Sequence, residues 1–110
     1  MECDVILIGN AGLGAGNQLG GLILANFLRL LGERDALPKY IILWNEGVRI
    51  ACEESDWIEH LKRLEERGVR IISCRTCIEF LGLEGRTCAG EVGNMSQIQD
   101  ILLSSKVLTV

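Results

Sequence analysis

The segment ISCRTCIEFLG (72–82) places two cysteines, Cys74 and Cys77, in a C-x-x-C spacing, with a strand-like run before them and a helix-like run after them. A cysteine attacks other atoms as a thiolate, and the unpaired N–H groups at a helix N-terminus stabilise that anion. Cys74 directly follows the expected strand, and Arg75 adds a neighbouring cation. We therefore predict Cys74 as the nucleophile, with Cys77 as a second sulfur acceptor or a resolving thiol.

Two other interpretations of the pair remain open. Half of a zinc site is the first, but the chain has no second C-x-x-C and only one histidine, His60. The second is simple packing, since free cysteines are among the most buried residues. Ligand spacing is absent at the other three cysteines, which are Cys3, Cys52 and Cys88. We therefore predict no metal and no cofactor. Cys88 is ambiguous, because a short strand could bring it near the pair.

The elements that must position the pair alternate along the chain. Apolar runs rich in β-branched residues predict strands, buried on both faces as in a parallel sheet, at 5–9, 40–45, 69–73 and 106–110, with a shorter one at 87–92. Helical periodicity predicts helices at 17–32, 55–67 and 95–104, and a short helix between Cys74 and Gly82. This order predicts one α/β domain over residues 1–110, a three-layer α/β/α structure with a mainly parallel five-stranded sheet.

Local signals indicate where these helices begin and end. Ser55 or Asp56 is the expected N-cap of the second helix and Gly68 its expected stop, while Asn94 is the expected entrance to the last helix.

The carboxyl ends of the strands should meet at one edge, which is where ligands bind in such sheets. The residues that follow the strands are 9–10, 45–47, 73–74 and 91–94. We therefore expect the rim of the thiol site to be formed by five side chains: Asn10, Asn45, Glu46, Arg75 and Asn94.

A glycine-rich loop, GNAGLGAGNQLGG (9–21), joins the first strand to the first helix. Gly12, Gly14 and Gly16 form G-x-G-x-G, which matches neither the dinucleotide fingerprint nor a P-loop. We favour a turn with positive φ and tight helix packing at Gly20 and Gly21, over a loop that cradles an anion.

Composition narrows the class of protein. A net charge of −4 without a basic cluster argues against nucleic-acid binding, and the apolar runs are too short to span a membrane. Five cysteines, an odd number, with no export signal predict a reducing cytoplasm. The content of 48% apolar residues, with 13 glycines besides, favours a homo-oligomer.

Four segments resemble the DsrE-like sulfurtransferase family, most closely the C-terminal domain of YedF-type selenium-metabolism proteins. They are LPKYIILWNEGVRIA (37–51), LEERGVRIISCRTCIEFLGL (64–83), GEVGNMSQI (90–98) and the closing KVLTV. The resemblance implies a small α/β/α domain that forms homo- or hetero-oligomers. In several members a cysteine persulfide carries sulfur that comes from a cysteine desulfurase through a TusA-like carrier.

The active cysteine of such members ends a strand, and a glycine follows eight residues later, as Gly82 follows Cys74 here. The resemblance thus implies a sulfur-transfer protein with Cys74 as carrier. The alternatives are a non-enzymatic binding or assembly module, in which the pair is structural or binds metal, and a thiol–disulfide oxidoreductase.

Overall fold

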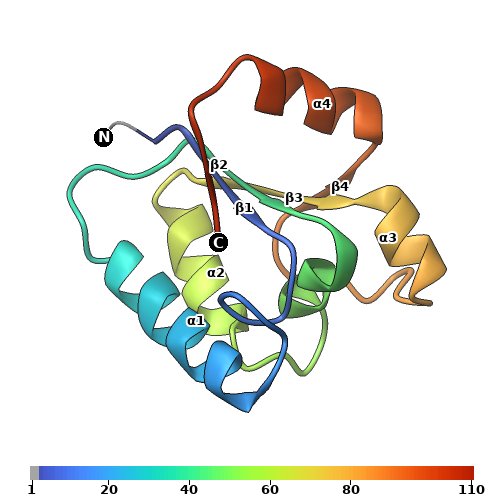
Figure 1. Ribbon diagram of the computed structural model, residues 1–110, viewed down its shortest axis with the longest axis horizontal. Coiled ribbons are helices and arrows are strands. Elements are labelled where there is room, and N and C mark those ends of the chain that lie inside the picture. The colour runs from blue at the N-terminus through green and yellow to red at the C-terminus, as the bar shows by residue number, and fades with distance from the viewer. Residues whose placement is uncertain (1–2) are drawn as a thin grey trace.

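A five-stranded, entirely parallel sheet forms the centre of the protein in the computed structural model, which describes residues 3–110 (Figure 1). The strand order is β4-β3-β2-β1-β5. The strands are β1 (Val5–Ile8), β2 (Tyr40–Leu43), β3 (Arg70–Cys74), β4 (Glu91–Gly93) and β5 (Val107–Thr109). The ends of all except β4 lie within two residues of the predicted apolar runs.

Helices cover both faces of the sheet, which confirms the three-layer α/β/α architecture. Figure 1 shows α1 (Gln18–Leu31) and α2 (Ile58–Glu66) below the sheet and α4 (Met95–Leu103) above it. Two short helices follow strands directly, η1 (Asn45–Ala51) after β2 and α3 (Arg75–Phe80) after β3.

The two faces have cores of unequal size, because side chains alternate along each strand. The larger core lies under α1, α2 and η1 and includes Ile6, Ile41 and Ile71 from the central strands. The smaller core lies under α4, whose only buried residue is Ile98, and it includes Cys74. Cys74 therefore points toward the thinner helical layer.

Several expected helix ends are confirmed. Asn94 caps α4, since its side-chain oxygen accepts the N–H of Gln97 at 2.8 Å. Gly68 and Gly82 follow α2 and α3 with φ of 95° and 70°, the left-handed conformation that suits glycine at a helix end.

The expected start of the second helix is wrong. The Ser55 hydroxyl donates to the carbonyl of Ile50 at 2.5 Å and accepts the N–H of Trp57. These bonds hold it in a turn, so that α2 begins only at Ile58, after an N-cap at Trp57 that makes no side-chain bond.

The expected strand at 87–92 is also shifted. β4 begins at Glu91, because Gly90 turns the chain with φ of 75° and lies so close to Ile71 that a Cβ would overlap the Ile71 carbonyl oxygen. Thr87 instead forms an isolated antiparallel bridge with Cys52.

No helix within residues 3–110 is long and apolar enough to cross a membrane.

Candidate functional site

The carboxyl edge of the sheet brings the two cysteines together with the segment that follows β2. In the parallel register Leu43 lies beside Ser73, and Cys74 lies beside Gly93. Cys74 is at once the last residue of β3 and the N-cap of α3, and Cys77 lies within the first turn of that helix. In the neighbouring strand β2, Leu43 is the last residue, and Trp44 alone separates it from η1. Because η1 and α3 both begin at this edge, they pack against each other.

A backbone N–H points at the sulfur of Cys77. The donor is Asn45, the first residue of η1, and its nitrogen lies 3.1 Å from the Cys77 Sγ. Asn45 has φ of 55°, a left-handed conformation that asparagine tolerates better than most residues. The sheet edge thus supplies a preorganised donor that would stabilise negative charge on this sulfur.

Gly47 fixes the position of that donor. A Cβ at Gly47 would overlap the carbonyl oxygen of Ile8 and would lie 3.3 Å from the nitrogen of Asn10. Only glycine allows η1 to lie this close to the end of β1. Through Gly47, the end of β1 therefore determines where the N–H of Asn45 points.

The two thiols differ sharply in exposure. Cys74 is 1% exposed and packs with Ile42, Ile72 and Ile98 in the smaller core. Cys77 is half-buried and contacts both cores, so part of its side chain meets solvent. Both thiols are free.

The anion-stabilising contact is not where the sequence predicted it. The side chain of Cys74 makes no capping hydrogen bond to α3, which has only six residues. The N–H that reaches a sulfur atom in this site comes from η1 and reaches Cys77.

Burial raises the pKa of the Cys77 thiol above its ordinary value, and the hydrogen bond from Asn45 opposes this rise. The neighbouring Cys74 thiol raises the pKa further. Cys77 is therefore mostly protonated at neutral pH, and its reactivity should grow as the pH rises.

We expect the alkylation rate of Cys77 by iodoacetamide, followed against pH, to inflect above about 8.5, the value of an unperturbed cysteine. Replacing Cys74 with alanine removes a group that raises this pKa, so the inflection should move to lower pH. Peptide mapping of alkylated Cys77 measures both curves. A wild-type inflection at or below that of a free cysteine peptide would contradict this expectation.

The five expected rim residues lie at this edge but differ in what they do. Asn45 is exposed and contributes its backbone N–H. Glu46 forms a surface ion pair with Arg49, and the Asn94 side chain is occupied as the cap of α4. Arg75 is exposed and forms no ion pair with any side chain in the described part of the chain, 3–110. Half-buried Asn10 lies beside Gly47.

The remaining cysteines lie away from the pair. Cys52 is buried, and burial is the main cause of its raised pKa. Cys88 is exposed, and its N–H donates to the carbonyl of Ala51, which places it beside the far end of η1. Cys3 packs against the edge of the larger core. Across residues 3–110, no three histidine, cysteine or acidic side chains gather as metal ligands would.

The glycine-rich loop shows the tight packing expected at Gly20 and Gly21. A Cβ at Gly20 would overlap the carbonyl oxygen of Ala15, and one at Gly21 would lie 3.2 Å from the indole of Trp57. Gly14 has φ of 76°. These contacts account for three of the glycines by packing and turn geometry.

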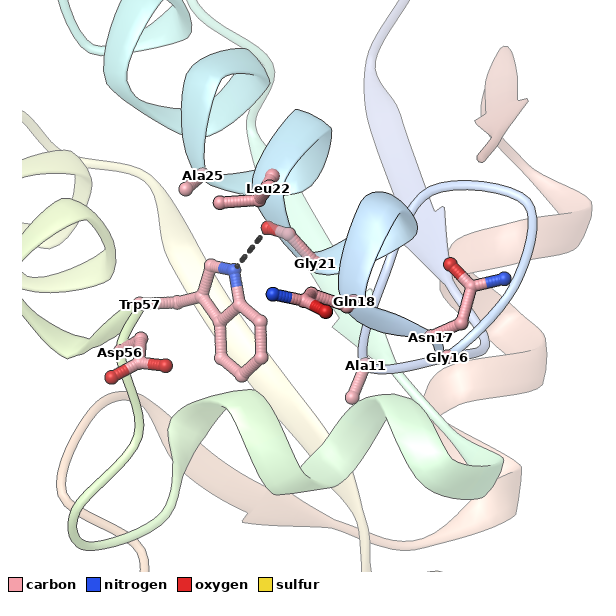
Figure 2. A pocket seen from close by; sticks show the side chains of 9 residues that line it. All are labelled: Ala11, Gly16, Asn17, Gln18, Gly21, Leu22, Ala25, Asp56 and Trp57. Carbon is pink, nitrogen blue, oxygen red and sulfur yellow. Dashed lines mark hydrogen bonds between the residues drawn. The ribbon is translucent and has the colours of Figure 1, made fainter.

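A pocket of about 530 Å³, which the sequence did not predict, lies where this loop meets α1 and the start of α2 (Figure 2). The Trp57 indole forms one wall and donates from Nε1 to the Gly21 carbonyl at 3.1 Å. Gln18 and Asp56 are its polar side chains besides Asn17, which caps α1. None of the pocket residues belongs to the thiol site.

Comparison with known proteins establishes the fold and no more. No protein-family model matches the sequence, and no curated protein matches it. Among solved structures, the ychN protein from E. coli has 18% identity and a TM-score of 0.75, over 98% of this chain and 99% of that chain.

Two further solved structures share this fold. The protein of unknown function MTH1491 from Methanobacterium thermoautotrophicum has 15% identity and a TM-score of 0.71, over 96% of this chain and 97% of that chain. The conserved protein of unknown function BT1422 from Bacteroides thetaiotaomicron has 19% identity and a TM-score of 0.63, over 97% and 95%. The shared fold fits the DsrE-like resemblance.

Proposed function

We propose that this chain is a sulfur-transfer protein that carries sulfane sulfur as a cysteine persulfide on the Cys74–Cys77 pair. One observation carries the proposal: two free thiols meet at the carboxyl edge of the sheet, and an N–H from Asn45 lies 3.1 Å from the sulfur of Cys77. Such a donor stabilises the thiolate or perthiolate anions that form and leave during sulfur transfer. Cys74 is the proposed carrier, as the resemblance implies, and Cys77 its partner.

The chemistry needs no redox cofactor. A cysteine thiolate attacks the outer sulfur of a donor persulfide, a new S–S bond forms, and the old S–S bond breaks to release the donor thiolate. Transfer to an acceptor thiol repeats this exchange, so no net oxidation takes place. Cys77 can also attack the inner sulfur of a Cys74 persulfide, which yields a Cys74–Cys77 disulfide and releases the outer sulfur as hydrosulfide.

The DsrE-like resemblance supports this proposal and suggests the donors. A cysteine desulfurase or a TusA-like sulfur carrier in a reducing cytoplasm is the proposed source of sulfur. Because the four matching segments resemble YedF-type selenium-metabolism proteins, the transferred atom is either sulfur or selenium.

Loading with a cysteine desulfurase and free cysteine tests the proposal. We expect mass spectrometry, after persulfides are trapped by alkylation, to show a one-sulfur adduct on the pair. The Cys74→Ser, Cys77→Ser double variant should carry none, while Cys88→Ser, which alters an exposed thiol outside the site, should load like the wild type. Failure of the wild type to load, under conditions that load a known acceptor, would refute the proposal.

A thiol–disulfide oxidoreductase is the second candidate, favoured by two free thiols that lie within one turn of α3. A Cys74–Cys77 disulfide with a potential near that of thioredoxin, about −270 mV, would support it. A persulfide that outlives the disulfide would count against it. If the pair neither takes up a persulfide nor forms a disulfide, the non-enzymatic module is favoured instead. Zinc found in equal molar amount in the purified protein would favour its metal-binding form.

We also propose that the chain forms homo-oligomers through α1. Three apolar residues on this helix lie within about 40° of one another around its axis. They are Leu19, Ile23 and Leu30, which are 68%, 43% and 52% exposed. Exposed apolar residues grouped on one face of a helix are typical of a surface that another chain covers.

The double substitution Leu19→Glu, Ile23→Glu should therefore lower the molecular mass measured by sedimentation to that of a monomer, because it places charges among these apolar residues. The matched control is Leu103→Glu, at an 81% exposed position on α4, and it should leave the mass unchanged. Wild-type protein that sediments as a monomer at high micromolar concentration would contradict this proposal.

A further inference from the structure

The two thiols of the site differ in whether another protein can reach them. Cys74 is 1% exposed, and α4 covers it through Ile98 in the smaller core. Cys77 is half-buried and carries the hydrogen bond from Asn45, at a position open to solvent. The two cysteines are nevertheless neighbours, because Cys74 is the N-cap of α3 and Cys77 lies in the first turn of that helix.

A protein-bound persulfide places strict demands on the first acceptor. The donor sulfur sits at the end of a cysteine side chain on another protein, and the attacking sulfur must come within about 3–3.5 Å of it in line with the S–S bond. Cys74 cannot meet this demand unless the layer above it opens. Cys77 meets it from the surface.

We infer that Cys77 is the receiving thiol and that Cys74 is loaded from it inside the protein. This order rests on the proposed function and assigns a direction to the pair. Cys77 thiolate attacks the outer sulfur of the donor, and the donor leaves as a thiolate. Cys74 thiolate then attacks the outer sulfur of the Cys77 persulfide, the Cys77 S–S bond breaks, and Cys77 returns as a thiolate beside the N–H of Asn45.

The second step moves the sulfur from Cys77, which is partly exposed to solvent, to Cys74, which is buried. The apolar residues around Cys74 exclude dissolved thiols, which would otherwise reduce the persulfide. Cys77 is thus the point of exchange with partners, and Cys74 the protected store. Both transfers are exchanges of one sulfane sulfur between thiolates, so they balance without an added oxidant or reductant.

Tryptic digestion places Cys74 and Cys77 in different peptides, so that an adduct on each can be measured separately. Trypsin cuts after Arg70, Arg75 and Arg86, so that Cys74 falls in the peptide IISCR (71–75) and Cys77 in the peptide TCIEFLGLEGR (76–86). Samples from the desulfurase reaction are quenched by alkylation at successive times, and the one-sulfur adduct is followed on each peptide. In the wild type we expect the adduct first on residues 76–86 and later on residues 71–75.

Single variants test the same order. Cys77→Ser should slow the appearance of sulfur on Cys74 by at least about tenfold, because the buried thiol loses its donor. Cys74→Ser should still load Cys77, at least as fast as the wild type does, because the Cys74 thiol raises the pKa of Cys77. A small thiol such as dithiothreitol should strip that exposed adduct faster than it strips the wild-type adduct. Thermal unfolding of each variant checks that it folds.

The outcomes separate this inference from the proposed function. Sulfur that appears first on residues 71–75 of the wild type, or a Cys77→Ser variant that loads at the wild-type rate, would overturn the order and leave sulfur transfer standing. A wild type that never loads on either peptide would refute both. The order of appearance in the wild type needs no variant, so the test holds even if a substitution prevents folding.

Discussion

Replacing Gly47 with alanine is expected to destabilise the protein by about 3 kcal/mol and to slow sulfur loading. The added Cβ overlaps the carbonyl oxygen of Ile8, a backbone atom of β1, which is held between β2 and β5 in the sheet. Because β1 cannot yield, η1 must move away, and the N–H of Asn45 leaves the Cys77 sulfur. One methyl group therefore disturbs both the fold and the thiol site.

Urea unfolding measures the first effect, and the pH dependence of Cys77 alkylation measures the second. Loss of the Asn45 hydrogen bond removes the contact that lowers the pKa of Cys77, so the alkylation curve should move to still higher pH. Gly16→Ala is the matched control, because a Cβ there lies 3.7 Å from the nitrogen of Ala11, an ordinary contact. It should change stability by less than about 0.5 kcal/mol. A Gly47→Ala variant that behaves like this control would contradict the account of η1.

Replacing Ile98 with alanine should have an equally large effect, on the other face of the sheet. Ile98 is fully buried and is the one buried residue of α4, so its loss should cost about 2–4 kcal/mol. It also opens a cavity in the core that contains Cys74. We therefore expect Cys74 to be alkylated at least about tenfold faster than in the wild type, since its cover is loosened.

Denaturant unfolding and alkylation of the tryptic peptide 71–75 measure these two changes. Leu103→Ala, on the same helix but 81% exposed, is the control and should alter neither. Rapid alkylation of Cys74 in the wild type, unchanged by Ile98→Ala, would show that α4 does not shield the thiol.

The sequence predicts four of the five strands well because each of them contains a short apolar run between polar segments. It also places Cys74 at the end of β3, because a buried run ends there and a helical pattern begins. The fourth strand is misplaced because its position depends on the contact of Gly90 with Ile71, nineteen residues earlier in the chain.

Most of the geometry of the thiol site could not be predicted from patterns of residue type. η1 has no capping side chain and too few residues for a periodic signal, so NEGVRIA reads only as a loop that follows a strand. The donor to Cys77 is a backbone N–H from a residue 32 positions away. Because every residue except proline has this N–H, residue type does not reveal which one acts as the donor. Gly47 after the second strand is the one available signal, since a glycine there permits close backbone contact.

The unequal helical layers have a consequence for motion. Three helices, α1, α2 and η1, hold one face of the sheet, whereas α4 alone holds the other, through one fully buried side chain. Regions with few buried apolar contacts open locally at a lower free energy than the whole protein unfolds. In hydrogen exchange, α4 should lose its protection before α1 and β1–β3 do. The access of a reagent to Cys74 would then report a local opening equilibrium, in which the buried thiol becomes accessible when a single helix lifts.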